Sequence, residues 1–386
     1  MNFELTKEQK KWAEQASDFT NQYIIPDAHH WDQNEMIPDT IFSLLGKLGY
    51  LGALIPSKYG GLEMDIISFG LLNEEIGRGC SSTRSLLTVQ TMVGLAIVKW
   101  GSQELRDYWL PLLASGEVLG SFALTEPELG SDAAKHQTTA TKKSEHYLLN
   151  GVKTYITFGT KADLFLIFAS VDNKSTAFLV PANTPNLTIE SINGMLGCRA
   201  ASLAKLTFID CPIHRENMLA RPGFGFSHVG NIALNNGRLT VAWGCVGILR
   251  ACLDSAMAYA HKREQFGKQL KEHQLIQEML TNMITHYRAA KLLCLEASHL
   301  ANKHNHQSIG AISTAKYFAS TAALRAASDA VQILGANGCR STATVQRFFR
   351  DAKIMEIIEG STQIQQQLIF NLTAKEYLKK RQNIEV

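Results

Sequence analysis

Apolar residues recur every three or four positions through the last third of the chain. Leu275, Met279 and Met283 form one such series, and Leu293, Ala297 and Leu300 form another. This spacing places apolar side chains on one face of a helix. The chain contains no proline after Pro222, and proline breaks helix interiors. We therefore expect a helical C-terminal region, with breaks between helices at the glycines 267, 310, 335, 338 and 360.

The middle of the chain has short β-rich segments about ten residues apart, a spacing typical of a β-sandwich or barrel. We expect a hairpin turn at Asn150 and Gly151, and another turn at Asp172 and Asn173, because these residue types tolerate positive φ. Further strands are expected over residues 163–171, 176–180, 187–192 and 203–209.

The first 120 residues favour helices again. Thr6 and Gln9 have the spacing of a capping box at the start of a first helix. Residues 68–76 and 83–100 are expected to form further helices. The fold class is therefore α+β. We expect an N-terminal helical domain over residues 1–120, a middle β-barrel or β-sandwich domain over 121–230, and a C-terminal four-helix bundle over 231–386.

Composition and charge exclude several classes of protein. The net charge is +3 in 386 residues without a basic run, which argues against a nucleic-acid partner. No apolar stretch reaches the roughly 18 residues of a membrane span, and the charged N-terminus has no secretory signal pattern. The seven cysteines lack Cys-x-x-Cys spacing, so we expect reduced thiols and a cytoplasmic location. The histidines at 299, 304 and 306 have no acidic or cysteine partner, so we expect no metal site there.

The common cofactor motifs are absent from the sequence. It has no P-loop, no HExxH, no GxSxG and no strand–GxGxxG–helix fingerprint. The glycines at 223, 225 and 230 match a dinucleotide loop only loosely, and no βαβ pattern surrounds them. We therefore expect neither a classical NAD enzyme nor a P-loop enzyme.

Three ordered segments carry a stronger signal. They cover residues 122–132, 263–274 and 330–363, the last including Arg350, Asp351 and the run Ile357 to Gln363. In this order and at these separations they resemble the acyl-CoA dehydrogenase family of flavoproteins, over about residues 3–375. The resemblance implies the helix–strand–helix domain order, an FAD cofactor, and removal of two hydrogens from the α and β carbons of an acyl thioester.

The resemblance also implies which residue takes the α proton. Glu359 matches the base of short- and medium-chain members, and it follows the apolar residues Ile357 and Ile358. An apolar setting raises the proton affinity of a carboxylate, as a general base requires. Arg238 matches an arginine near that base, and the family's alternative base position is occupied here by Gly237. Residue type alone would also allow Glu359 to be an ordinary acid at a helix end, before a capping box formed by Thr362 and Gln365.

The remaining site residues are implied by the same resemblance and concern the flavin. Residues of the middle domain would meet its ring and pyrophosphate, residues of a neighbouring subunit would hold its adenine-diphosphate half, and residues near the C-terminus would receive the pyrophosphate and adenosine. The middle-domain residues are Phe122, Thr125, Gly130, Ser131, Tyr155 and Thr157. The residues of the neighbouring subunit are Arg263, Phe266 and Gln274. The residues near the C-terminus are Gln332, Gly335, Ala336, Ser361 and Gln363. Turn and cap chemistry remains an alternative for Thr125, Ser131 and Ser361.

Several positions depart from the family pattern. Aromatic, acidic or aliphatic residues replace the usual ones around the ring and the acyl pocket; they are Tyr155, Phe158, Glu128, Ala336, Ile358 and Ala201. These departures leave the acyl group open. The sequence also resembles the family branch of secondary-metabolite pathways, whose members often oxidise acyl groups tethered to a carrier protein.

The leading hypothesis is an FAD-dependent acyl-CoA dehydrogenase. The alternatives are the same scaffold acting on a carrier-protein acyl or aminoacyl thioester, as in polyketide or nonribosomal peptide biosynthesis, and a non-catalytic protein that retains the fold. Expected partners are an acyl-CoA or acyl carrier protein thioester and, as electron acceptor, an electron-transfer flavoprotein or oxygen. Because subunits would share flavin ligands, we expect a homodimer or homotetramer.

Overall fold

The computed structural model describes residues 4–382, with side chains through residue 374. Its first part is helical, as expected. The helices are α1 (Lys7–Phe19), α2 (Ala28–Asn34), α3 (Asp39–Lys47), α4 (Ile66–Gly79), α5 (Ser81–Trp100) and α6 (Gln103–Ser115). The predicted capping box is confirmed, because the Thr6 hydroxyl accepts a hydrogen bond from the Gln9 N–H while the Gln9 side chain accepts one from the Thr6 N–H.

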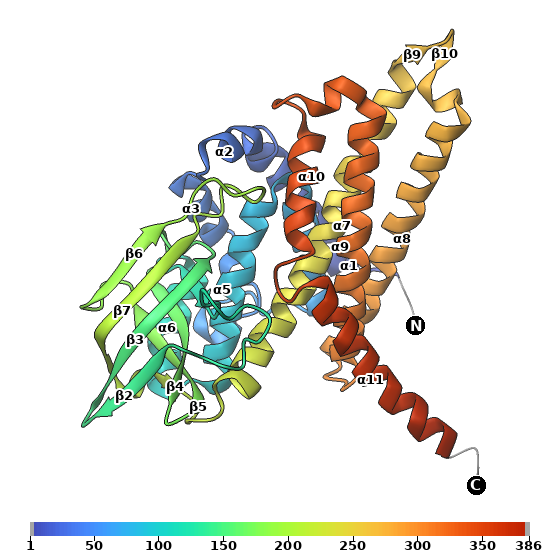
Figure 1. Ribbon diagram of the computed structural model, residues 1–386. Coiled ribbons are helices and arrows are strands. Elements are labelled where there is room, and N and C mark those ends of the chain that lie inside the picture. The colour runs from blue at the N-terminus through green and yellow to red at the C-terminus, as the bar shows by residue number, and fades with distance from the viewer. Residues whose placement is uncertain (1–3, 383–386) are drawn as a thin grey trace.

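The middle part is one eight-stranded sheet (Figure 1). Its strands are β1 (Gly120–Ala123), β2 (Thr139–Lys143), β3 (His146–Ile156), β4 (Leu164–Val171), β5 (Lys174–Pro181), β6 (Leu187–Ser191), β7 (Ala204–His214) and β8 (Met218–Leu219). The strand order is β6-β7-β3-β2-β4-β5-β8, with β1 paired to β4. Leu149 and Phe208 share an apolar core with Phe165 and Phe178 from the other half of the sheet. The two halves of this one sheet therefore share an apolar core, and the expected middle β domain is confirmed.

One predicted turn is confirmed and the other is wrong. Asp172 and Asn173 have φ of 48° and 61° and join β4 to β5. Asn150 and Gly151 instead lie inside β3, where the pairing with β7 shifts register. The Asn150 side chain exchanges hydrogen bonds with Asp210 across that shift, and a Cβ at residue 151 would crowd Thr138. The pair therefore forms a bulge, because cross-strand contacts decide its conformation.

The C-terminal part is helical, and helices α7–α10 pack together as the expected bundle. The elements are α7 (Asn231–Lys262), β9 (Glu264–Gln265), β10 (Lys268–Gln269), α8 (Gln274–Asn302), α9 (Ser308–Leu334), α10 (Thr344–Met355) and α11 (Thr362–Gln382). Gly310 lies within α9, so the break expected there is wrong. Leu275 is 73% exposed, so it does not share the buried face of Met283. The domain boundaries at 120/121 and 230/231 stay predictions.

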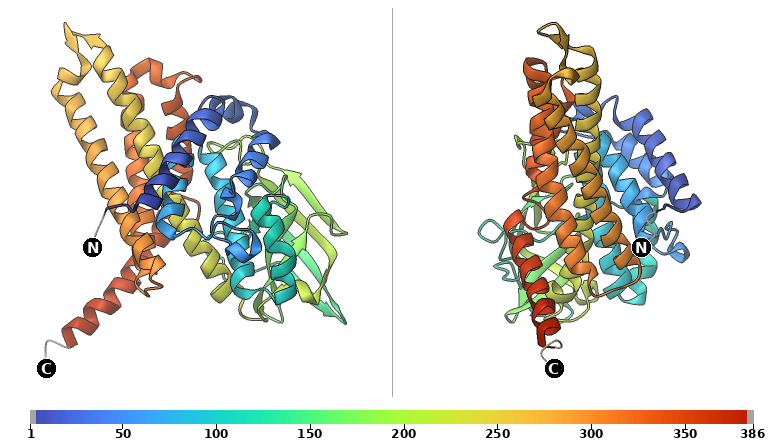
Figure 2. Two further views of the ribbon diagram at one scale, coloured as in Figure 1. Left: turned by 180° about the vertical axis from the view of Figure 1, so that it is seen from behind. Right: turned by 90° about the vertical axis from the view of Figure 1, so that its right-hand side faces the viewer.

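Helix α7, with the π-helical turn before it, is long and apolar enough to cross a membrane by length and composition. Most of its apolar window is buried, however, and α7 packs against α4, α5, α8 and α9. These contacts make α7 the central helix of the protein core. Helix α11, in contrast, projects away from the body in Figure 1 and in the left view of Figure 2.

Candidate active site

Glu359 lies in the loop between α10 and α11, in an unusual backbone conformation. Its φ is 56° and that of Gly360 is 88°, so two consecutive residues are left-handed. A non-glycine residue pays a conformational cost there and needs support from its surroundings. Lys316 of α9 supplies part of that support, because its buried ammonium donates to the carbonyl of Gly360 at 2.8 Å. Gln365 donates to the carbonyls of Glu359 and Gly360 at 3.0 and 3.1 Å.

The carboxylate of Glu359 points into the protein. Its Oε2 atom is buried and has no hydrogen-bond partner among the described residues. Burial raises the pKa of Glu359 from 4.5 to about 7, while the cations Arg238, Arg84 and Lys316 act in the opposite direction. A carboxylate with a pKa near neutrality can accept a proton from carbon and release it again. The environment therefore suits a general base.

Helix α7 leaves room for this carboxylate by having a glycine opposite it. A Cβ atom at Gly237 would overlap Oε2 of Glu359. The position that the sequence identified as an empty alternative base site is therefore filled by the side chain of Glu359.

Replacing Gly237 by alanine should push the Glu359 carboxylate out of place. We expect the rate of substrate-dependent flavin reduction to fall about 10²-fold, because small displacements of a catalytic group have effects of that size. Gly310→Ala is the matched control. It also adds a methyl group inside a helix, but its nearest neighbour is Leu372 at 3.7 Å, an ordinary contact. Equal rates for the two variants would show that the glycine at 237 is not needed.

Arg238 is buried beside Glu359 but contacts its backbone rather than its carboxylate. The Nε atom donates to the Glu359 carbonyl at 3.4 Å, and Nη1 donates to the Asn235 side chain at 2.9 Å. Burial lowers the pKa of Arg238, and the charge of Glu359 opposes this. Arg238 therefore contacts the Glu359 loop and lowers the pKa of Glu359 by its charge, while its part in catalysis stays a prediction.

The helix start after Glu359 differs from the prediction by one residue. The hydroxyl of Ser361, not of Thr362, accepts from the N–H of the residue three positions ahead, Ile364, at 3.4 Å. Gln365 turns back to the carbonyls of the Glu359 loop instead of to the start of α11. The predicted capping box of Thr362 and Gln365 is therefore wrong, because Gln365 is needed to hold the left-handed loop.

The loop after β1 contains Thr125, Gly130 and Ser131. A buried ion pair holds this loop in place. Lys153 donates to Oε1 of Glu126 at 2.7 Å, and both side chains are buried. Glu126 also accepts from the N–H groups of residues 137 and 138. The sequence analysis missed this pair, because a lysine and a glutamate 27 residues apart give no local signal.

The other middle-domain candidates lie at the ends of β1 and β3. Phe122 is half-buried, with its ring centroid 5.2 Å from that of Phe168. Tyr155 is 57% exposed and has φ of 57°, and Thr157 follows it directly after β3. A large aromatic ring held outward in a left-handed conformation is available for stacking.

The remaining candidates lie elsewhere on the chain. Arg263, Phe266 and Gln274 lie in or beside the β9–β10 hairpin at one tip of the bundle (Figure 1). Phe266 is 95% exposed there. Gln332, Gly335 and Ala336 lie at the C-terminal end of α9. Ser361 and Gln363 lie at the start of α11. In one protomer the β9–β10 hairpin lies far from the middle β domain (Figure 1).

Most of the candidate residues have polar side-chain groups that are free to bind a flavin. In the part of the chain with described side chains, no hydrogen bond is recorded for the side chains of Thr125, Ser131, Thr157, Arg263, Gln274, Gln332 and Gln363. Only the Ser361 hydroxyl is engaged, in the helix cap just described. Adding a Cβ at Gly130 or Gly335 would meet no atom within 4 Å. These positions are therefore open to a ligand.

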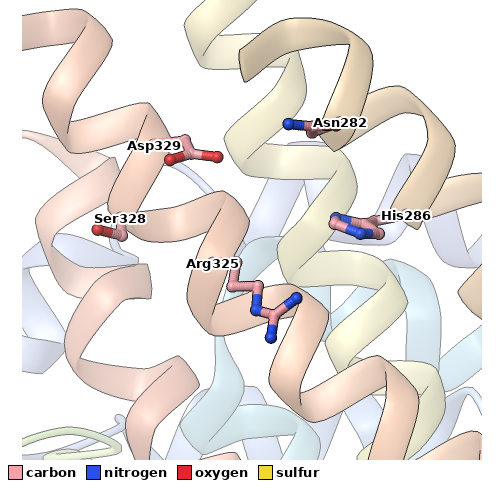
Figure 3. A pocket seen from close by; sticks show the side chains of 5 residues that line it. All are labelled: Asn282, His286, Arg325, Ser328 and Asp329. Carbon is pink, nitrogen blue, oxygen red and sulfur yellow. The ribbon is translucent and has the colours of Figure 1, made fainter. Parts of the chain in front are cut away.

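Two further observations concern other kinds of site. Among the described residues, no group of three or more His, Cys, Asp or Glu side chains could hold a metal ion. A pocket between α8 and α9 is lined by Asn282, His286, Arg325, Ser328 and Asp329 (Figure 3). Glu359 does not line this pocket.

Comparison with known proteins decides the family. The acyl-CoA dehydrogenase N-terminal, middle and C-terminal domain models match residues 6–117, 121–211 and 223–371. The chain belongs to the acyl-CoA dehydrogenase family. The prediction of an FAD-dependent enzyme that dehydrogenates an acyl thioester is thereby confirmed for the family.

Individual relatives and solved structures match nearly the whole chain. A probable acyl-CoA dehydrogenase, YngJ of Bacillus subtilis (strain 168), is 38% identical over 376 residues, covering 96% of this chain and 98% of that relative. The structure of butyryl-CoA dehydrogenase from Megasphaera elsdenii has a TM-score of 0.94 at 32% identity, covering 97% and 100% of the two chains. The prolyl acyl carrier protein oxidase AnaB has a TM-score of 0.91 at 27% identity, covering 96% and 100%.

Proposed function

We propose that this chain introduces an α,β double bond into an acyl thioester, with Glu359 as the base that takes the α proton. The buried, unpartnered Oε2 of Glu359 is the observation that carries the proposal. FAD, when bound, supplies the acceptor for the β hydride at its N5 position. The residues implied by the resemblance, from Thr125 to Gln363, would hold it.

The backbone at Glu359 supports the same chemistry. Proton removal next to a thioester places negative charge on the carbonyl oxygen, which needs a hydrogen-bond donor. No acceptor within the described chain is recorded for the N–H of Glu359. This N–H is therefore free to bind the thioester oxygen, while Arg238 and Gln365 fix the peptide on its other side.

The proposal is tested by mixing the purified holoenzyme with acyl-CoA thioesters without oxygen and following loss of the flavin absorbance. Reduction by at least one thioester, followed by appearance of the enoyl product, is the expected result. A purified protein without flavin would favour the alternative of a non-catalytic protein.

The rate of flavin reduction should increase with pH. Glu359 must be ionised to accept a proton, and its pKa is raised to about 7. The rate is therefore expected to rise about tenfold per pH unit below pH 7 and to level off above it. Lys316→Met removes a cation that lowers this pKa, so the midpoint should move to higher pH. A profile that is flat from pH 5 to 8 would contradict the assignment.

A second function is favoured by the likeness to AnaB, whose name describes a carrier-protein oxidase. In this alternative, the same site dehydrogenates an acyl or aminoacyl group tethered to a carrier protein. Matched CoA and carrier-protein thioesters of one acyl group separate the two, by the rate of flavin reduction. Reoxidation of the reduced flavin by air or by an electron-transfer flavoprotein then identifies the electron acceptor.

A cytoplasmic location remains part of the proposal.

We expect the flavin-bound protein to be a homodimer or a tetramer of two dimers. The hairpin residues Arg263 and Phe266 are distant from the loop at Ser131 in one protomer, so a second copy must supply them to a shared flavin. Sedimentation of the holoenzyme measures this. Phe266→Ala should lose flavin, while Tyr108→Ala, which also removes an exposed ring, should not. A flavin-bound monomer would contradict the expectation.

A further inference from the structure

Lys316 of α9 is a buried cation that no carboxylate pairs with directly. Its side chain is fully buried, and no ion pair with a carboxylate is found for it among the residues with described side chains. The carboxylate of Glu356 pairs instead with Lys353, at 2.8 Å. Burial lowers the pKa of Lys316 to about 8, while the charges of Glu359 and Glu356 act in the opposite direction. A buried charge is costly unless other groups stabilise it, so the ammonium depends on its hydrogen bonds.

The hydrogen bonds of Lys316 go to backbone carbonyls of the loop that carries the base. Its Nζ atom donates to the carbonyl of Gly360 at 2.8 Å and, over a longer distance of 3.4 Å, to the carbonyl of Glu356. Glu356 caps the C-terminal end of α10, where the helix dipole favours a cation. The same Glu356 carbonyl accepts from the N–H of Thr362 at 2.9 Å, so residues 356–362 form a closed loop. Lys316 bridges this loop from its first residue to a residue near its end.

The base lies inside the bridged segment. Glu359 and Gly360 are the two consecutive left-handed residues, with φ of 56° and 88°, and such a conformation persists only where the surroundings hold it. The carbonyl of Gly360 receives two side-chain donors, Lys316 at 2.8 Å and Gln365 at 3.1 Å. These bonds fix the backbone on the C-terminal side of Glu359. They thereby set the direction of its carboxylate, which lies against Gly237, and of its free N–H.

We propose that Lys316 is a positioning residue for proton removal from the acyl thioester. By bridging residues 356–362 it keeps two groups of Glu359 aligned with the substrate, the carboxylate with the α carbon and the N–H with the thioester oxygen. This inference rests on the proposed function, because it concerns the group on which Glu359 acts. A displacement of about 1 Å can cost a catalytic group about 10²-fold in rate, so a lysine that holds only backbone can still decide the rate of the chemistry.

The first test is the limiting rate of flavin reduction in holoenzyme carrying Lys316→Met. Methionine is unbranched like lysine, but it cannot donate to the two carbonyls. On the plateau of the pH profile, where the base is ionised, we expect the limiting rate to fall about 10²-fold while KM stays nearly unchanged. A plateau rate equal to that of the parent overturns the proposal. No reduction of the parent by any acyl thioester instead overturns the proposed function.

A second readout needs no hydride transfer. Acetoacetyl-CoA has an acidic α proton, and its β carbon is a carbonyl with no hydrogen to lose, so it can form an enolate at this site but cannot reduce the flavin. Titration of the oxidised holoenzyme, followed through the flavin spectrum, measures this binding. We expect it to be about tenfold weaker in Lys316→Met, because the N–H that meets the oxyanion is displaced. Equal affinities for parent and variant would show that the loop is aligned without the lysine, and would overturn the proposal.

Two further variants separate positioning from general stability. Arg347→Met is the matched control, because Arg347 is also a buried cation that donates to a backbone carbonyl, that of Gly79 at the end of α4, at 2.8 Å. It should lower the melting temperature and leave the plateau rate and the acetoacetyl-CoA affinity unchanged. Lys316→Gln keeps N–H donors without the charge, so it should lose less of the plateau rate than Lys316→Met.

The remaining outcomes each count against the proposal. Equal losses in Lys316→Gln and Lys316→Met would assign the effect to charge alone rather than to the hydrogen bonds that bridge the loop. A loss of rate in Arg347→Met as large as in Lys316→Met would assign it to general destabilisation. If neither Lys316 variant folds, the lysine serves the fold as a whole and the specific role in proton removal is overturned.

Discussion

Replacing Glu359 by glutamine is expected to leave a yellow, flavin-containing protein that its substrate no longer bleaches. Glutamine has nearly the same shape but cannot accept the α proton, so the rate constant of flavin reduction should fall by about 10²- to 10⁴-fold. Stopped-flow absorbance without oxygen measures this. A variant reduced at the parental rate would rule out Glu359 as the base.

The stability of this variant provides the control. The pKa of Glu359 is about 7 in the folded protein against an ordinary value of 4.5, so the folded state disfavours the ionised form. Ionisation therefore destabilises the folded protein progressively between pH 4.5 and 7, and fully above pH 7. Glu359→Gln should melt at a higher temperature than the parent above pH 7, and at a similar temperature near pH 4. A lower melting temperature at pH 8 would indicate a structural role for the carboxylate.

Replacing Lys153 by methionine is expected to have the largest effect on stability. It would leave Glu126 as a buried carboxylate with no cation, at a cost of about 3–5 kcal/mol in the free energy of unfolding. Burial lowers the pKa of Lys153 to about 8, although Glu126 opposes this. Because Glu126 also ties down the backbone at residues 137 and 138, the loop at Thr125 should loosen and bind flavin less tightly. Denaturant unfolding and flavin content measure both effects.

Two further variants test whether the loss of stability comes from the unpaired buried charge of Glu126. Adding Glu126→Gln to Lys153→Met removes the unpaired charge, so the double variant should regain stability. Lys205→Met breaks an exposed ion pair with Glu190 and should cost no more than about 1 kcal/mol. If the two single lysine variants lost equal stability, burial of the Lys153 pair would not matter.

The sequence alone predicted what depends on local pattern and on the order of motifs. Apolar spacing and the absence of proline after Pro222 predicted the helical bundle, and positive-φ residue types predicted the turn at Asp172 and Asn173. The ordered motifs identified the family, and with it Glu359. The conformation of helices and turns is set by residues that are close together in the sequence, so the local pattern can predict it.

Contacts between distant segments decided the rest. Asn150 and Gly151 form a bulge because β7 lies beside them, and Gln365 leaves the helix cap because the Glu359 loop needs its amide. The environment of the base comes from Arg84 on α5, Gly237 on α7 and Lys316 on α9, residues far from Glu359 in sequence. Burial and charge depend on what surrounds a group in space, so the raised pKa of Glu359 follows only from the tertiary structure.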